Sequence, residues 1–534
     1  MAHAPRFLRV VAAKSRVRQV EFDGYGNFRQ ALAGLRLLLT CLALLFPCTS
    51  RLLAQTDLTG FWVLRIPNRG VTYFDLKQSG DLVTGKFVYG GAVQSLGGTF
   101  SAGKLRLEIS RQRVYEGIVD GGKIAVTAPV KGVLERCARE AVYPPRLALP
   151  ELQDVPDNGL ARTPPMGWNS WNKFHEGIDD ATVRATADAM VSSGMSKVGY
   201  RYIVVDEGWS SSRGADGKIT SNDRFPDMKA LVDYVHSKGL KFGIYSSPGP
   251  QSCGGYQGSY GHEEDDARTF ASWGVDYLKY DWCTAAVVYQ STREESQAVS
   301  QKMGQALLDT GSPIVFSIHS MGEVWEWGTN AGANLWRTTN DIADTWQSIE
   351  RIGFAQLNLA GYAKPGHWND PDMLEIGNGG MNADEYRTHM SLWCLLAAPL
   401  MAGNDLRTMT EETKSILMNS EAIAIDQDRD VKTVRRVERE GRTEVWVRPL
   451  RDSQTARFGV EHSAAVGLFN RGDQAADVSV RWEDLQLGAV VGAKSLHARD
   501  LWKHEDAPVT ADRYAATVPA HGVVLLKVSA VPTR

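Results

Sequence analysis

The sequence lacks the excess of basic charge that a protein needs to gather phosphate groups. Its 59 lysines and arginines are balanced by 62 aspartates and glutamates, which gives a formal net charge of -3. A chain without a positive field is a poor partner for nucleic acid. We therefore expect no nucleic acid among its partners.

Cysteine is also scarce. The six cysteines include no C-x-x-C pair, and the 11 histidines are scattered along the chain. Structural zinc sites need such clustered ligands, so we expect no metal centre. The chain also lacks internal repeats and low-complexity tracts, which excludes solenoid architectures.

No apolar run is long enough to cross a bilayer. The most apolar stretch runs for ten residues from Leu37 to Phe46 and follows a basic segment. Such a run is too short for a membrane span but typical of a secretory signal, with cleavage near Ala54 or Gln55. We predict that residues 1–55 are an export segment and that the protein is secreted or periplasmic. A retained anchor, or a true start further along the chain, stays open.

What the sequence does have is length and aromatic side chains. With 534 residues and 43% hydrophobic content it can build several cores, which favours two to four domains. It also contains 15 tryptophans. Most tryptophans serve in cores, but their flat rings also suit stacking on the C–H faces of sugars.

Residues 56–142 read as short alternating segments separated by glycines. This rhythm predicts a small all-β domain, either an antiparallel barrel or a sandwich. Its role stays open between a packing module and a carbohydrate-binding module. A linker with several prolines follows at residues 143–160.

Between residues 161 and 430, apolar strand-like runs alternate with amphipathic helical stretches. About eight such units in roughly 265 residues fit a (β/α)₈ barrel, whose active site lies at the carboxyl ends of the strands. Residues 431–534 return to short strands and predict an antiparallel β-sandwich. The expected fold is therefore an α/β barrel between two all-β domains.

Two aspartates follow strand-like runs and lie close to a cation and a tryptophan. Asp281 ends DYLKYD, where a period of two places it on the same face as Lys279. A nearby ammonium group lowers the pKa of a carboxyl, which suits a nucleophile. A purely structural Lys279–Asp281 ion pair would give the same pattern.

The second aspartate, Asp341, lies four residues after Arg337, with Trp336 and Trp346 nearby. Apolar walls would raise the pKa of its carboxyl and keep a proton available for a leaving group. Alternatively, Asp341 caps the helix that NDIADTW begins. A pair of carboxylates at strand ends is the minimum required to cleave a glycosidic bond.

Several long motifs then occur in a fixed order, and the similarity that they carry covers about 370 residues including the C-terminal sandwich. They are LARTPPMGWNSWNKF at 160, YIVVDEGW at 202, FPDMKALVDYVHSKGLKFGIYS at 225, WGVDYLKYDWC at 273, WRTTNDIADTW at 336 and HWNDPDML at 367. In these motifs the chain resembles the α-galactosidase (melibiase) family, glycoside hydrolase family 27. The N-terminal all-β module lies outside the resemblance.

The resemblance implies a retaining glycosidase that needs no metal or organic cofactor, with Asp281 as nucleophile and Asp341 as acid/base. It also implies a disulfide between Cys253 and Cys283, which agrees with export. The implied sugar-contacting positions are Trp171, Asp206, Tyr245, Lys279, Arg337 and Asp372.

Two positions depart from the family pattern. Glu207 stands where most members carry a second aspartate, and its extra methylene could fill the space of the galactose hydroxymethyl group. A small backbone shift would also absorb it. The loop His319-Ser320-Met321 stands where plant-like members read C-E-W, so Ser320 replaces the glutamate that is a partner of the 2-position substituent.

The expected activity is hydrolysis of terminal α-D-galactosyl groups from an oligosaccharide or glycan. Glu207 keeps β-L-arabinopyranosidase activity open, because L-arabinopyranose matches galactose without its C6 group. The Ser320 loop keeps α-N-acetylgalactosaminidase activity open. A lectin that kept the pocket without catalysis is the non-enzymatic alternative, and the retained carboxylates argue against it.

Overall fold

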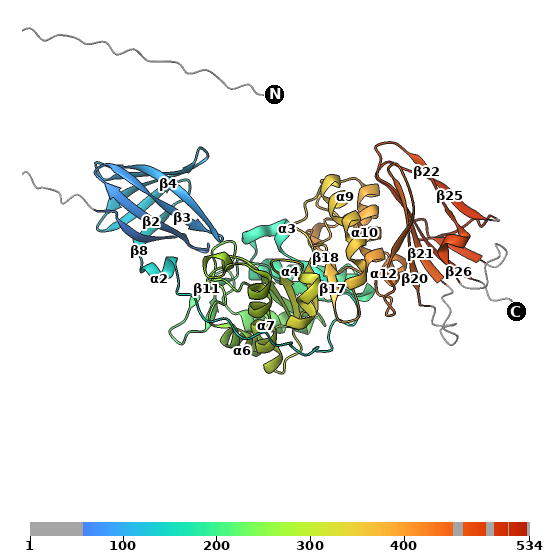
Figure 1. Ribbon diagram of the computed structural model, residues 1–534, viewed down its shortest axis with the longest axis horizontal. Helices are drawn as coiled ribbons and strands as arrows, with labels where there is room; N and C mark the ends of the chain where they lie inside the picture. The colour runs from blue at the N-terminus through green and yellow to red at the C-terminus, as the bar shows by residue number, and fades with distance from the viewer. Residues whose placement is uncertain (1–56, 452–462, 488–495, 511, 531–534) are drawn as a thin grey trace, which may run out of the picture. The chain divides into compact units, whose positions relative to one another are not determined.

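A computed structural model describes residues 57–451, 463–487, 496–510 and 512–530. The chain from Leu58 onward forms one compact unit, in which an all-β part, a β/α part and a second all-β part follow one another (Figure 1). The predicted export segment, residues 1–55, lies outside the described residues. Within the described ranges, no helix is both long enough and apolar enough to cross a membrane.

The first part is a closed antiparallel barrel of eight strands. Strand β2 shows the pattern that builds it, because Thr72, Phe74 and Leu76 are buried while the residues between them are partly exposed. Of the two all-β architectures that the sequence left open, the structure forms the barrel. The strands are β1 (Gly60–Arg65), β2 (Thr72–Ser79), β3 (Leu82–Tyr89), β4 (Ala92–Ser101), β5 (Lys104–Ser110), β6 (Arg113–Asp120), β7 (Lys123–Ala128) and β8 (Gly132–Arg136).

Eight parallel strands form the catalytic part, in the order β17-β16-β15-β14-β13-β10-β9-β18. A parallel bridge from Leu374, just after β17, to Ala402 in β18 links the two ends of this order. The predicted (β/α)₈ architecture is confirmed. The strands are β9 (Met166–Asn169), β10 (Tyr202–Val204), β13 (Lys241–Ser246), β14 (Tyr277–Asp281), β15 (Val315–His319), β16 (Leu335–Arg337), β17 (Trp368–Asp370) and β18 (Leu400–Ala402).

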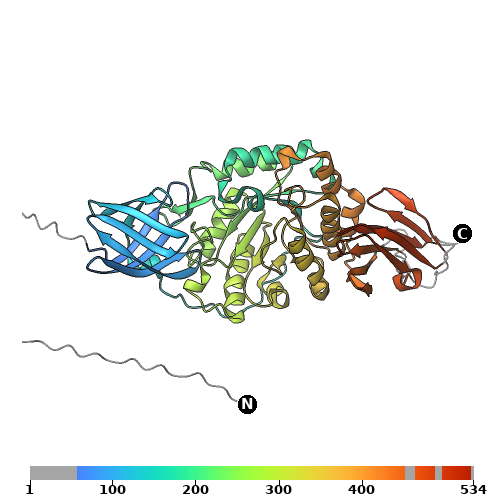
Figure 2. The same cartoon turned by 90° about the horizontal axis from the view of Figure 1, so that it is seen from above.

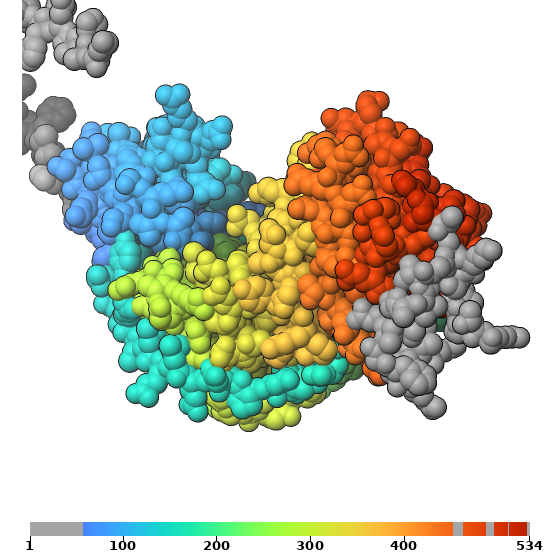
Figure 3. Space-filling view, turned by 45° about the vertical axis from the view of Figure 1, so that its right-hand side comes forward, coloured from blue at the N-terminus to red at the C-terminus, as the bar shows by residue number. Residues whose placement is uncertain are grey.

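Helices surround these strands, and their residues contribute to a continuous surface coloured teal to yellow (Figures 2 and 3). Polar residues fix the helix starts: Asp179, Asp227 and Thr292 each accept a hydrogen bond from the third backbone N–H beyond them. The helices are α2 (Arg139–Val142), α3 (Trp171–Phe174), α4 (Asp180–Ser192), α5 (Met228–Ser237), α6 (Glu263–Trp273), α7 (Arg293–Asp309), α8 (Val324–Trp327), α9 (Trp346–Ala355), α10 (Ala383–Leu396), α11 (Glu411–Leu417) and α12 (Ser420–Asp426). A hairpin, β11 (Ser210–Arg213) and β12 (Ile219–Ser221), extends from the loop after β10.

The C-terminal part is antiparallel, as predicted. Six strands form one sheet in the order β19-β20-β21-β26-β23-β24, and β22 pairs with β25 in a second sheet. Strand β21 is buried along its whole length because it lies inside the first sheet. The strands are β19 (Arg435–Glu440), β20 (Thr443–Leu450), β21 (Ser463–Asn470), β22 (Ala476–Arg481), β23 (Leu496–Asp500), β24 (Glu505–Ala507), β25 (Arg513–Val518) and β26 (Val523–Ala530).

Candidate active site

Polar side chains gather at the carboxyl ends of the parallel strands. Strand register places Asp281 beside His319 and Arg337 beside Asp370, at the last residues of four neighbouring strands. Because parallel strands end at one edge, side chains from distant parts of the sequence meet there. This edge holds most of the sequence-predicted residues.

Asp281 is the most strongly perturbed carboxyl of the group. Its Oδ2 accepts a hydrogen bond of 3.2 Å from the Tyr245 hydroxyl, and its Oδ1 lies 3.0 Å from His319 Nδ1. The His319 contact is close, but it does not have the geometry of a well-aligned hydrogen bond. Burial by itself would raise the pKa of Asp281, but the charges of His319, Lys279 and Arg337 outweigh it and hold the pKa well below its usual range. Asp281 is therefore ionised over the whole working pH range of an ordinary enzyme.

Lys279 acts on Asp281 from a distance, since its direct partner is a different carboxylate. Its Nζ lies 2.8 Å from Oδ2 of Asp206, which also accepts a 2.8 Å hydrogen bond from the Asn169 side chain. The alternative of a simple Lys279–Asp281 ion pair is thus wrong. Burial alone would lower the pKa of Lys279, but the charges of Asp206 and Asp281 raise it by more than burial lowers it. The ammonium group therefore stays charged.

Arg337 connects the second carboxylate to the sheet edge. Its Nη2 lies 3.1 Å from Oδ1 of Asp341 and 3.0 Å from Oδ2 of Asp372. Asp372 is fixed further by a 2.9 Å hydrogen bond from the backbone N–H of Ile342. The Arg337 side chain is only 3% exposed whereas that of Asp341 is 77% exposed, so a buried cation holds a carboxylate that faces solvent.

Two expectations about Asp341 are wrong. Trp336 is buried in the barrel core, with its Nε1–H donating to Asn369, and Trp346 stacks on His521, so neither ring walls the Asp341 carboxylate. Asp341 does not cap a helix either, because α9 begins at Trp346 and its cap is Thr345. The adjacency of these tryptophans in sequence misled because strand and helix directions turn both rings into the hydrophobic core of the barrel rather than toward the carboxylate.

The disulfide between Cys253 and Cys283 ties the loop after β13 to the end of β14. The same loop binds Glu207, whose Oε2 accepts a 2.8 Å hydrogen bond from the Gly254 backbone N–H. Burial is the main cause that raises the pKa of Glu207 to about 7. Among the described cysteines, Cys137 and Cys394 are free thiols.

Trp171 begins the short helix α3 after β9, and Ser320 lies directly after β15. The Trp171 ring is half-buried and meets the His175 ring edge-on at 5.5 Å. The Ser320 hydroxyl is buried and has no protein partner in the described part, which is also true of Arg337 Nε and Thr339 Oγ1. Buried polar atoms without partners at the edge of a site are positions for substrate or water to fill.

Sequence reasoning missed three residues of this edge: His319 as a partner of Asp281, Asn169 as a partner of Asp206, and the buried Asp370. Each ends a parallel strand, and that position alone was the available signal. Burial is the main cause that raises the pKa of Asp370, partly offset by Arg337. No group of three or more metal-binding side chains occurs within the described ranges.

Residues 163–428 match the family model described as Alpha galactosidase A, and residues 440–528 match that of the Alpha galactosidase C-terminal beta sandwich domain. Over 380 residues the chain is 45% identical to the alpha-galactosidase of Cyamopsis tetragonoloba, covering 68% of this chain and 86% of that one. This chain belongs to the alpha-galactosidase family. It is a glycoside hydrolase of that type, and the family resemblance of its motifs is confirmed.

Solved structures extend the comparison of this alpha-galactosidase family member. Alpha-galactosidase I from Mortierella vinacea superposes with a TM-score of 0.65 at 36% identity, over 71% of this chain and all of that one. A Bacteroides fragilis protein provisionally described as an alpha-galactosidase/melibiase gives 0.64 at 32% identity, over 88% of this chain and 91% of that one. If residues 58–142 were left out, the rest of the chain would be shorter than the matched 88%. The second match therefore includes part of the N-terminal barrel.

Proposed function

We propose that this protein is a retaining exo-α-galactosidase that removes terminal α-D-galactosyl groups from an oligosaccharide or glycan. The observation that carries the proposal is the Asp281 carboxylate, which is kept ionised at the end of β14 by His319, Lys279 and Arg337. A permanently charged carboxylate at this position is what a glycosidase nucleophile requires. Membership of the alpha-galactosidase family supports galactose as the sugar.

In the proposed mechanism Asp281 attacks the anomeric carbon while Asp341 gives its proton to the departing glycosidic oxygen. The C–O bond to the leaving group breaks, and a covalent galactosyl–Asp281 ester forms. Asp341 then removes a proton from water, which attacks the same carbon and releases Asp281. Two inversions at one carbon retain the anomeric configuration. The exposure of Asp341 suits this role, since leaving group and water both arrive from solvent.

The charged cluster on the other side of Asp281 suits the hydroxyls of the sugar. Lys279 offers N–H donors, Asp206 offers an acceptor, and both are held in place by their 2.8 Å contact and by Asn169. Charge-assisted hydrogen bonds of this kind position a polar substrate strongly in a buried site. Trp171 offers an apolar ring face beside them.

The family matches support galactose over L-arabinopyranose, and the Glu207 carboxylate is held by the Gly254 N–H of the disulfide loop. The test compares kcat/KM on nitrophenyl α-galactoside and nitrophenyl β-L-arabinopyranoside, before and after Glu207→Asp. We expect the parent to prefer the galactoside and the substitution to leave that preference in place. A parent that prefers the arabinopyranoside, with reversal on substitution, would overturn the choice of sugar.

The nucleophile is tested by Asp281→Ala. We expect a loss of about 10⁴-fold or more in kcat on nitrophenyl α-galactoside, because covalent catalysis disappears. Added azide should enter the vacated space and restore turnover, with galactosyl azide as the product. Residual activity within tenfold of the parent would remove Asp281 from this role. A pocket that binds galactose while the parent shows no turnover would establish the lectin alternative.

We also propose that the protein is exported to act on glycans outside the cytoplasm. The disulfide beside the active site supports this, because such bonds form and persist in oxidising compartments. Fractionation of the native host should find the activity outside the cytoplasm, in a chain that lacks residues 1–55. An active, full-length cytoplasmic protein would contradict export.

A further inference from the structure

The N-terminal barrel touches the loops that carry the active site. The backbone N–H of Val71 donates a 2.9 Å hydrogen bond to the carbonyl of Gly255, two residues past Cys253. The turn between β3 and β4 also packs against this loop. A Cβ added to Gly90 would lie only 2.5 Å from the carbonyl oxygen of Cys253, so the turn has no room for a side chain. The contacted loops follow β13 and β14, so the barrel lies at the carboxyl-end face of the parallel strands.

A cavity of about 240 Å³ lies at this contact. Its walls include Tyr89, Arg69 and Arg113 from the N-terminal barrel, and Glu176 and Gly254 from the catalytic barrel. Burial raises the pKa of Tyr89 to about 12, and Glu176 adds to the shift, so the phenol stays neutral beside a carboxylate. Gly254 is also the residue whose N–H holds Glu207, which connects the cavity wall to the sugar site.

The charged and phenolic side chains that line this cavity have no polar partner in the described part of the chain. The side chains of Tyr89, Arg69, Arg113 and Glu176 make no hydrogen bond or ion pair with any other residue that the structure describes, although Arg113 lies over the Phe87 ring at 5.5 Å. Two guanidinium groups supply donors, a carboxylate supplies an acceptor and a tyrosine supplies a ring face. That combination recognises the hydroxyls and C–H face of a sugar. The volume suits one sugar unit, below the roughly 300 Å³ at which pockets for drug-sized ligands begin.

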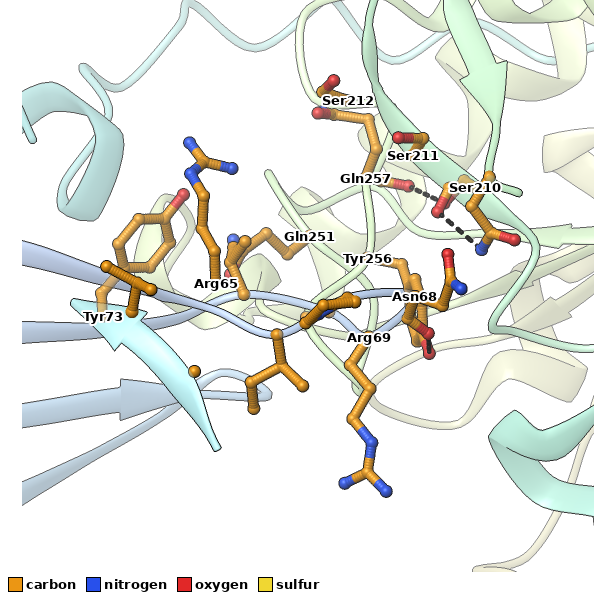
Figure 4. A pocket seen from close by; sticks show the side chains of 18 of the residues that line it. Arg65, Asn68, Arg69, Tyr73, Ser210, Ser211, Ser212, Gln251, Tyr256 and Gln257 are labelled. Carbon is orange, nitrogen blue, oxygen red and sulfur yellow. Dashed lines mark hydrogen bonds between the residues drawn. The ribbon is translucent and has the colours of Figure 1, made fainter. Parts of the chain in front are cut away.

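A larger cavity, of about 1060 Å³, adjoins the same loop of the N-terminal barrel. Figure 4 shows Tyr73 and Arg65 facing it from the barrel and Ser210, Ser211 and Gln257 from the catalytic part. Arg69 lines both cavities. Glu176, Gly254 and Tyr89 do not line this second cavity, so it lacks the link to Glu207.

We infer that the smaller cavity is a subsite for a sugar unit of the leaving group, so that the N-terminal barrel makes the enzyme prefer galactosyl oligosaccharides to simple galactosides. This inference rests on the proposed function. An exo-glycosidase holds the terminal galactose in its pocket, and the rest of the chain must leave past the rim. Glu176 lies between β9 and α4, and its Oε1 and the Glu207 carboxyl both lie beside Gly254.

The test measures kcat/KM for raffinose, whose leaving group is a disaccharide, and for nitrophenyl α-galactoside. Tyr89→Ala should lower the raffinose to nitrophenyl ratio about tenfold, chiefly through a higher KM for raffinose, because an aromatic–sugar contact is lost. Arg113→Gln, at an exposed position, should lower the ratio in the same direction and covers the case that Tyr89→Ala does not fold. Tyr73→Ala is the matched control, a tyrosine of the same barrel that lines the larger cavity.

Each outcome of these measurements either supports or contradicts the proposed subsite. If the ratio stays within twofold in Tyr89→Ala and Arg113→Gln, the subsite does not exist. If Tyr73→Ala lowers the ratio as much as Tyr89→Ala, the leaving group lies in the larger cavity and the assignment is wrong. Failure of the proposed function is distinguishable, because the parent enzyme would then not hydrolyse nitrophenyl α-galactoside, and the subsite would fall with it.

Discussion

The two all-β parts meet the catalytic barrel in opposite ways. Trp446 and Phe469 of the C-terminal sandwich belong to the same hydrophobic core as the barrel, and both pack edge-on against Phe354 of α9 at about 5.5 Å. The N-terminal barrel keeps a separate core around Trp62 and Phe74 and meets the catalytic barrel through backbone turns and polar side chains. A shared core makes one folding unit, whereas a contact between turns can adjust a site without supporting its fold.

We expect the largest effect from a substitution that disrupts the shared core. Trp446→Ala should lower the free energy of unfolding by about 3–5 kcal/mol, because a fully buried indole leaves a cavity between sandwich and barrel. Chemical denaturation followed by tryptophan fluorescence and by hydrolysis of nitrophenyl α-galactoside should show both transitions moving together.

The matched control is Trp62→Ala, which removes an equally buried indole from the separate core. It should destabilise the N-terminal barrel while nitrophenyl hydrolysis survives. If Trp62→Ala shifts the denaturation midpoint of that activity as far as Trp446→Ala does, the two all-β parts do not differ as described.

The next effect is electrostatic, because a buried glutamate lies near each contact. Burial raises the pKa of Glu207 to about 7, so its contribution to stability is complete below about pH 4.5 and is lost as the pH rises toward 7. Burial would raise the pKa of Glu444 too, but Trp446, Arg471 and Arg436 lower it, so its contribution is present near neutrality and lost on acidification.

Unfolding free energies at pH 5 and pH 8 test this difference. Glu207→Gln should flatten the decrease between these pH values, by roughly 3 kcal/mol at most. Glu444→Gln should not change the difference in unfolding free energy between pH 5 and pH 8. It should instead weaken the pH dependence of the unfolding free energy below pH 4.5. Identical pH profiles for the two variants and the parent would show that neither glutamate titrates differently in the folded state.

The smallest effect concerns the turn between β3 and β4. Gly90 has φ +57 and would place a Cβ 2.5 Å from the Cys253 carbonyl, whereas Gly80 has φ +59 and nothing near its Cβ. Gly90→Ala and Gly80→Ala should therefore share the backbone cost of about 1 kcal/mol, and only Gly90→Ala should shift the disulfide loop. We expect Gly90→Ala alone to lower the ratio of raffinose to nitrophenyl kcat/KM. Equal ratios in both variants would mean that the contact does not reach the substrate.

The sequence was sufficient for the barrel and for most of its edge, because period-two strands and helical stretches are local patterns. Asp281 and Lys279 follow from one strand. The partner of Lys279 could not be predicted from that strand, since Asp206 lies 73 residues away and only the strand order brings the two residues together. The predicted environment of Asp341 was wrong for a related reason: proximity in sequence does not say whether a tryptophan ring faces the site or the core, and both rings near Asp341 enter the barrel core.

The separate core of the N-terminal barrel bears on how the family changes over evolutionary time. The whole Mortierella vinacea chain is matched by 71% of this one. A barrel with its own core, joined by a linker and a few turn contacts, can be acquired by recombination without any repacking of the host. New substrate ranges can therefore arise when a domain such as the N-terminal barrel is joined to an unaltered set of catalytic carboxylates. The C-terminal sandwich cannot be exchanged in this way, because it shares a core with the catalytic barrel.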